Sequence, residues 1–144
     1  MLTLTLALCA GLLASPVQAS PEVDQLAESA AKGDAAAIKS LVELSRKRDA
    51  DAEYALGLMA HEGRGLQRNL RQAFRLVERA AGRGHVEAQN TLGYFHQHGL
   101  GTVANAGQAL TWYRRSAEAG NPRAQVNMGW LYEQGLVRLE GFTA

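Results

Sequence analysis

Small and apolar residues recur at helical spacing through most of this chain. Three segments carry such residues at the first, fifth and eighth positions of a run. Steps of three and four residues place side chains on one face of an α-helix, so each segment is predicted to be a helix with one buried face. Each helix is expected to end at a glycine, which readily adopts the left-handed conformation that closes a helix. The segments are 50–62, 86–98 and 122–134, and the closing glycines are Gly63, Gly99 and Gly135.

Further helices are predicted between and before these segments. Residues 70–83 and 106–119 follow Asn69 and Asn105, whose side chains can accept hydrogen bonds from the free amides of a first helical turn. The N-terminal part is expected to form a helix pair. This pair covers 22–32 and 35–47, with Asp34 as the N-cap of its second helix.

The helices belong to a repeat of 36 residues. Too many glycines align at this spacing for chance, and a fixed period indicates a repeat architecture. One aligned glycine falls in the middle of each first helix, where it costs about 1 kcal/mol relative to alanine. We therefore expect a close helix crossing at these three positions. The aligned sets include Ala52, Ala88 and Ala124, then Leu56, Leu92 and Met128, then Gly57, Gly93 and Gly129.

The repeat resembles the Sel1-like repeat family, which is related to the tetratricopeptide repeat. The first unit departs from the family pattern at Leu76 and Val77, where the family prefers Trp-Tyr. Asn69 and Asn105 stand where the family has aspartate. The second unit matches best, through Ala88, Leu92, Gly93, Gly99, Gly101, Ala109, Trp112, Tyr113, Ala117 and Gly120.

The resemblance implies an all-α fold, an α/α superhelical solenoid of Sel1-like repeats with an N-terminal helical cap. It also implies a role as an adaptor or regulator that binds other proteins. The expected organisation is a signal peptide at 1–19, a capping helix pair at 20–49, Sel1-like repeats at 50–85 and 86–121, and a partial third repeat with a C-terminal tail at 122–144.

The first residues predict export. An uncharged apolar run from Leu2 to Leu13 is followed by Val17-Gln18-Ala19, which is typical of a secretory signal peptide cleaved after Ala19. The run is shorter than the roughly 20 residues of a transmembrane helix. Cys9 is the chain's one cysteine and lies in this segment, so we expect no disulfide after cleavage. A periplasmic or secreted protein with no transmembrane segment in the mature chain is predicted; a retained, anchoring helix is the alternative.

Charge is unevenly distributed, although the whole chain carries a net charge of only +1. Residues 22–62 hold nine acidic and five basic residues, whereas residues 63–83 hold six arginines and one acid, Glu78. Four arginines at steps of four form a candidate secondary basic face; a solvated outer face with Glu78 as local partner is the alternative. The near-neutral total and the expected export argue against nucleic acid as a partner. The four arginines are Arg71, Arg75, Arg79 and Arg83.

No residue pattern supports catalysis, a cofactor or a metal site. Ser29 and Lys32 match the Ser-x-x-Lys of penicillin-recognising enzymes, but the companion Ser-Asp-Asn and Lys-Thr-Gly motifs do not occur. His96 and His98 lie two residues apart on a helix and point about 200° apart, so they cannot share a metal. A pairing of His61 with His98 across adjacent repeats stays possible. We predict a protein that is not an enzyme.

The candidate binding site is the exposed face of the first helices, because these helices line the concave surface of a two-helix solenoid. With Ala52, Leu56 and Ala60 toward the core, positions 54, 58 and 61 of each unit face away from it. Aromatic and apolar residues there are typical of protein contacts. Packing beneath the cap or the C-terminal tail is the alternative. The predicted set is Tyr54, Leu58, His61, Asn90, Tyr94, Gln97, Val126, Trp130 and Glu133.

The sequence therefore predicts a secreted or periplasmic adaptor or regulator that binds a protein or peptide. Two alternatives remain: a cell-envelope enzyme of the penicillin-recognising or peptidoglycan-related kind, and a structural accessory subunit of an envelope complex. An enzymatic activity has been proposed for some cysteine-rich relatives, whose disulfides are not expected here. Co-purification with one stoichiometric partner would support the accessory subunit.

Overall fold

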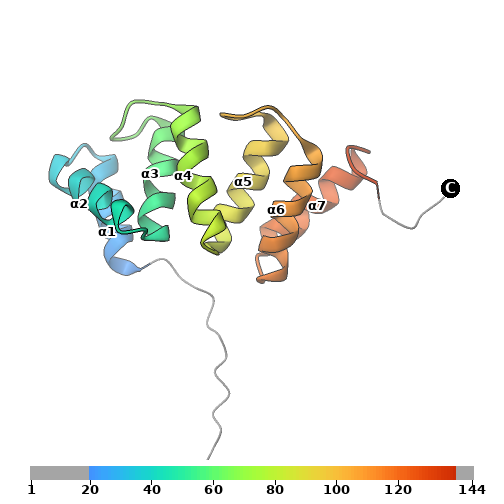
Figure 1. Ribbon diagram of the computed structural model, residues 1–144, viewed down its shortest axis with the longest axis horizontal. Helices are drawn as coiled ribbons and strands as arrows, with labels where there is room; N and C mark the ends of the chain where they lie inside the picture. The colour runs from blue at the N-terminus through green and yellow to red at the C-terminus, as the bar shows by residue number, and fades with distance from the viewer. Residues whose placement is uncertain (1–19, 139–144) are drawn as a thin grey trace, which may run out of the picture.

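The computed structural model describes residues 20–138, and every regular element within this range is an α-helix (Figure 1). The expectations for the signal segment 1–19 and for the end of the tail, 139–144, fall outside the described residues. The helices are α1 (Pro21–Ala31), α2 (Ala35–Arg46), α3 (Ala50–Glu62), α4 (Leu70–Gly82), α5 (Val86–His98), α6 (Ala106–Glu118) and α7 (Pro122–Glu133).

Three of the helices begin directly after the side chains that the sequence predicts as N-caps. Asp34 accepts from the amide of Ala36 at 2.9 Å, and Asn69 and Asn105 accept at 3.0 and 2.9 Å from the amides three residues later. These bonds satisfy first-turn amides that have no partner within the helix. α3 and α5 end at glycines in the left-handed conformation, as the sequence predicts. Local sequence thus accounts for the helix boundaries.

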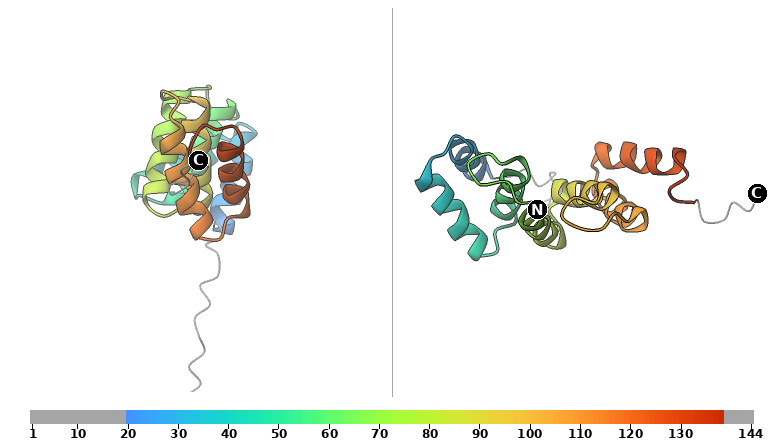
Figure 2. Two further views of the ribbon diagram at one scale, coloured as in Figure 1. Left: turned by 90° about the vertical axis from the view of Figure 1, so that its right-hand side faces the viewer. Right: turned by 90° about the horizontal axis from the view of Figure 1, so that it is seen from above.

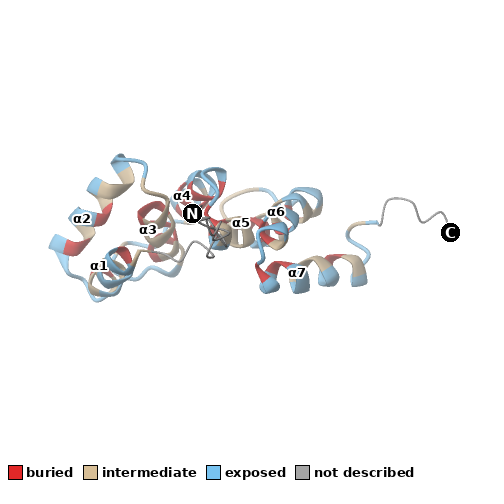
Figure 3. Cartoon of the chain, turned by 90° about the horizontal axis from the view of Figure 1, so that it is seen from below, coloured by how far each residue is buried: buried red, intermediate tan, exposed pale blue. Residues whose placement is uncertain are grey.

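Consecutive helices pack side by side into a curved stack (Figure 2). α3 and α5 each pack against the second helix of their own repeat and against the helix that precedes them, as α5 does with α6 and α4, whereas α7 packs against α6. Seen from below, α1 and α7 lie on the same side of the stack, with α3 and α5 set back between them (Figure 3). That side is concave, and the other side carries α2, α4 and α6. The all-α solenoid is confirmed.

The core is divided along the stack into three clusters, which is typical of repeats that contact their neighbours alone. α1 and α2 pack on α3 through Val23, Leu41 and Leu56, all buried. The function of this pair as a cap remains a prediction. The middle cluster joins α3, α4 and α5, and the last one joins α6 to α7 around Tyr113 and Leu131.

The close crossing predicted at the mid-helix glycines holds at two of the three positions. A Cβ atom on Gly93 would lie 2.5 Å from Cδ1 of Tyr113, and one on Gly57 would lie 2.8 Å from Cγ2 of Val77. At Gly129 the prediction is wrong, because no described atom of another helix lies within 4 Å of the position a Cβ would take. α7 is the last described helix, so no second helix of its own repeat packs across that glycine within residues 20–138.

Candidate protein-binding face

Two of the nine predicted site residues link successive first helices across the concave side. The Tyr54 hydroxyl lies 3.1 Å from the Thr91 hydroxyl, and the side-chain Oδ1 of Asn90 accepts from the side-chain Nδ2 of Asn127 at 3.0 Å. Both bonds join residues 37 positions apart, so the same contact recurs in consecutive repeats. Tyr54 and Asn90 therefore help to fix the spacing of α3, α5 and α7.

Two further predicted residues turn toward neighbouring helices. His61 packs against the ring of Phe95 with centroids 5.1 Å apart. The Tyr113 hydroxyl donates to the Gln97 side-chain oxygen at 2.6 Å. Burial raises the pKa of the Tyr113 phenol, so this hydroxyl keeps its proton and remains a donor. His61 and Gln97 therefore contact neighbouring helices, and their side chains are partly exposed.

The middle position of each repeat is the exposed apolar part of the face. Tyr94 and Trp130 are 43% and 42% exposed, and Leu58 at the equivalent position of α3 is partly exposed. Tyr94 stacks on His98, one turn further along α5, with ring centroids 4.3 Å apart. We call Leu58, Tyr94 and Trp130 the apolar row. Val126 and Glu133 on α7 are exposed beside it.

A groove of about 890 Å³ opens at the N-terminal end of the concave side, between α1, α3 and the start of α5. Its apolar floor includes Tyr54, Leu58 and Met59, two of which belong to the predicted set. Ala27 and Ala31 of α1 form the opposite wall. Sequence analysis missed this wall because α1 is not a copy of the repeat. The excess of acidic residues in 22–62 was the one sequence feature that could have pointed to this part of the site.

Carboxylates surround this groove, which we call the acidic groove. Five line it, against the one guanidinium of Arg64. Glu28 pairs with Lys32 at 2.8 Å, and this contact lowers the pKa of Glu28; Glu62 lies 3.5 Å from Arg64. The net charge of the lining is therefore negative at neutral pH. The five acids are Asp24, Glu28, Asp51, Glu62 and Glu87.

His85 sits at the rim of the acidic groove as the N-cap of α5. Its Nδ1 accepts from the Ala88 amide at 3.1 Å, so the neutral ring carries its proton on Nε2, 3.3 Å from Oδ1 of Asp51. The ring also packs on Tyr54 at 4.5 Å. Burial lowers the pKa of His85 in spite of the nearby Asp51 carboxylate. The imidazole is therefore neutral at pH 7.

The four arginines of the candidate basic face, which we call the arginine row, fall into two pairs with different surroundings. Arg79 and Arg83 lie 3.3 and 2.9 Å from the carboxylate of Glu53, which is only 1% exposed. Their partner is thus a buried acid on α3, and the expectation of Glu78 as the local partner is wrong. Arg71 and Arg75 are exposed.

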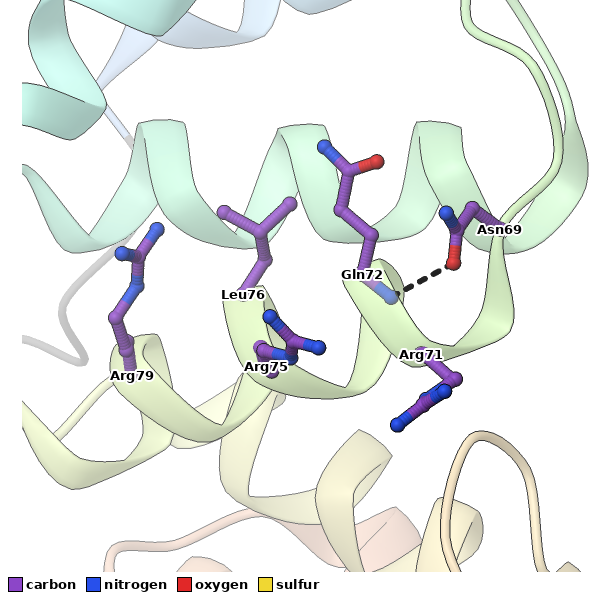
Figure 4. A pocket seen from close by; sticks show the side chains of 6 residues that line it. All are labelled: Asn69, Arg71, Gln72, Arg75, Leu76 and Arg79. Atoms are coloured by element: carbon purple, nitrogen blue, oxygen red, sulfur yellow. Dashed lines mark hydrogen bonds between the residues drawn. The ribbon is translucent and has the colours of Figure 1, made fainter.

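Arg71, Arg75 and Arg79 line a shallow hollow of about 520 Å³ on the opposite, α4 side of the stack (Figure 4). All of its lining residues belong to α4 or to its N-cap Asn69, so a single helix provides the whole surface. A binding site usually needs walls from more than one element. This hollow is a weaker candidate than the acidic groove.

Lys32 and the four histidines, which are described residues weighed for catalysis or metal binding, contact other side chains. Lys32 forms its ion pair with Glu28, one residue before Ser29. Each of the four histidines packs against a different aromatic ring. Within residues 20–138, no group of three potential metal ligands comes together.

Comparison with known families identifies the repeats. The model of the Sel1 repeat matches residues 50–85, 86–121 and 122–140, which together make up more than half of the chain. The chain belongs to the Sel1 repeat family. Such repeats generally mediate protein–protein interaction. Among curated proteins, no sequence matches this chain significantly.

Solved Sel1 structures share the fold. A Sel1 repeat protein from Oxalobacter formigenes superposes with a TM-score of 0.71 at 31% identity, over 78% of this chain and 47% of that one. The protein c5321, a protective antigen of uropathogenic Escherichia coli strains, superposes with a TM-score of 0.65 at 32% identity, over 68% of this chain and 21% of that one. This Sel1 chain thus spans less than half the length of either protein. Cysteine-rich protein B of Helicobacter pylori superposes with a TM-score of 0.60, over 78% of this chain and 99% of that one. Because the two sequences are only 15% identical, this likeness shows the fold alone.

None of the helices in residues 20–138 has the length and apolarity that crossing a membrane requires.

Proposed function

We propose that this Sel1 protein is a non-catalytic adaptor or regulator outside the cytoplasm, periplasmic or secreted after cleavage near Ala19. Its concave face would bind a protein or peptide partner. The observation that carries the proposal is the acidic groove, where apolar side chains and an excess of carboxylates from three helices meet. The apolar row extends from its floor across the repeats.

The composition of the groove defines the partner. Tyr54, Leu58 and Met59 provide apolar surface for one or two aliphatic or aromatic side chains. Among the described residues, Asp24 and Glu87 at the rim make no ion pair, so they are available to lysines or arginines of a ligand. The preferred ligand is therefore a segment that carries basic residues on both sides of an apolar anchor.

Selection of random displayed peptides on the immobilised protein tests this preference. Peptides with a positive net charge around an aromatic or aliphatic residue should be enriched. An enrichment of acidic peptides would overturn the proposal and favour the arginine hollow of α4.

A charge-reversal pair then locates the binding site. The Asp24→Lys/Glu87→Lys variant should bind a selected peptide at least tenfold more weakly at low salt, and this effect should shrink as salt screens the charges. The control is Glu78→Lys/Glu118→Lys, which changes the net charge equally at exposed positions outside the acidic groove. Equal weakening in both variants would show that only the total charge matters and would refute the groove as the site.

A further inference from the structure

Asp51 is a largely buried carboxylate without a cationic partner among the described side chains. Its side chain is 18% exposed, and the described basic group nearest to it is His85, which is neutral at pH 7. An ionised carboxylate with little solvent requires a compensating charge or several hydrogen bonds. The backbone nitrogen of Ser20 supplies one bond, donating to Oδ2 of Asp51 at 2.9 Å.

Ser20 is also the residue that signal-peptide cleavage after Ala19 would leave at the N-terminus. Hydrolysis by an endopeptidase adds water to the Ala19–Ser20 bond. The Ala19 carbonyl becomes a carboxylate, and the Ser20 nitrogen takes up protons to become an ammonium. The same atom that now donates through a single amide hydrogen would then carry a positive charge and three hydrogens.

We propose that cleavage after Ala19 creates an α-ammonium at Ser20 that forms an ion pair with Asp51 and ties α1 to α3 at the rim of the acidic groove. The proposal rests on the proposed export of this protein. Asp51 and Pro21 both line the groove, so the new terminus lies at its edge. Maturation would thereby strengthen the contact between the N-terminal helix pair and the first repeat.

The surroundings of the Ser20 nitrogen favour the charged form. The titratable groups that line the adjoining acidic groove are Asp24 and Glu28 on α1, Asp51 and Glu62 on α3, Arg64 after α3, and His85 with Glu87 at the start of α5. Five are carboxylates, one is a neutral imidazole, and the one guanidinium is paired with Glu62. The ammonium would keep the capping geometry, since the Ser20 hydroxyl accepts from Val23 and its carbonyl accepts from Asp24.

A folded-state pKa raised above the unfolded value has a defined consequence for stability. An α-amino group ordinarily has a pKa of about 7.7–8.0, and a carboxylate at hydrogen-bond distance raises this pKa because it favours the charged form. The stabilisation is then complete at pH values below the unfolded-state pKa and is lost as pH rises through the higher folded-state pKa.

The test begins with the mature protein. The full chain is expressed with export, and the N-terminus of the exported product is determined by mass spectrometry. A product that begins at Ser20 is expected; any other N-terminus overturns the proposal at the stage of processing.

The ion pair itself is tested with the chain that begins at Ser20 and a control extended by Ala19, which moves the ammonium by one residue. The mature form should melt about 2–5 °C higher at pH 7. Its α-amino pKa, followed by NMR, should be raised in the mature protein and should return to the ordinary range in Asp51→Asn. The matched control Asp24→Asn should leave that pKa raised.

An ordinary α-amino pKa in the mature protein, or an equal loss of stability from Asp51→Asn in both forms, would refute the ion pair. Neither result would affect export or peptide binding, which are read from the cell fraction and from the groove variants. A failure of the ion pair is therefore distinguishable from a failure of the proposed function.

Discussion

Gly93 offers a sharp test of the packing, because the chain contains its own control. An alanine at this position would place its Cβ 2.5 Å from Cδ1 and 2.6 Å from Cε1 of Tyr113. That ring is fully buried and is held at its far end by the bond to Gln97. The ring cannot move away without displacing α6 or breaking this bond. Overpacking of this kind costs about 1–3 kcal/mol.

The net effect combines three contributions. Loss of the hydrogen bond from the Tyr113 hydroxyl to Gln97 would add about 1 kcal/mol to this destabilisation, and the better helix propensity of alanine would offset about 1 kcal/mol of it. Gly93→Ala should therefore destabilise by roughly 1–3 kcal/mol. Gly129→Ala gains the same propensity without a described clash and should stabilise by up to about 1 kcal/mol. Gly57→Ala, against the 2.8 Å contact with Val77, should fall between them.

Urea unfolding followed by circular dichroism measures these differences, provided that the slope of the free energy against urea concentration stays equal among the variants. Because helix propensity cancels between equivalent positions, Gly93→Ala and Gly129→Ala should differ by about 2–4 kcal/mol. Equal stabilities would refute the reasoning, since the cost would then not come from the Tyr113 ring.

Other predictions address charge, pH and binding. Arg83→Ala should lower the free energy of unfolding by about 2 kcal/mol, because it removes a cation that compensates the buried Glu53 carboxylate. In the same urea assay, Arg75→Ala should change the free energy of unfolding by no more than about 0.5 kcal/mol. Equal losses in the two variants would contradict the division of the arginine row. Because burial lowers the pKa of His85, the unfolded chain binds a proton more readily, and stability should fall as pH drops through about 6.5. His85→Asn, which can keep the cap, should flatten that part of the melting-temperature curve, and an unchanged curve would exclude His85 as the cause. Tyr94→Ala should weaken binding of a selected peptide that reaches the apolar row by tenfold or more in fluorescence anisotropy without loss of helix content, and unchanged affinity would remove Tyr94 from the site.

Local features of the fold were predictable from the sequence, whereas contacts between distant residues were not. The helix ends at Gly63 and Gly99 depend on neighbouring residues alone, and repetition every 36 residues made them visible. Glu53 as the partner of Arg83 is 30 residues away and depends on how α3 and α4 cross. Gly129 lacks its predicted close neighbour because the packing of a repeat differs at the end of the described stack.

The candidate site shows the same division. Helical periodicity placed Tyr54, Leu58 and Tyr94 on one face. It could not distinguish the residues whose side chains bond to neighbouring helices from those whose side chains remain available to a partner. Gln97 has the same periodicity and is bound to Tyr113. The α1 wall of the acidic groove depends on the angle at which an irregular helix packs on α3, which no repeat pattern encodes.

The most direct test of the central claim is an NMR titration of the isotopically labelled protein with the strongest selected basic peptide. The proposal predicts that chemical-shift changes concentrate at Asp24, Leu58 and Glu87, in the acidic groove, and extend toward Tyr94. Changes centred instead on Arg75 and the outer surface of α4 would contradict it.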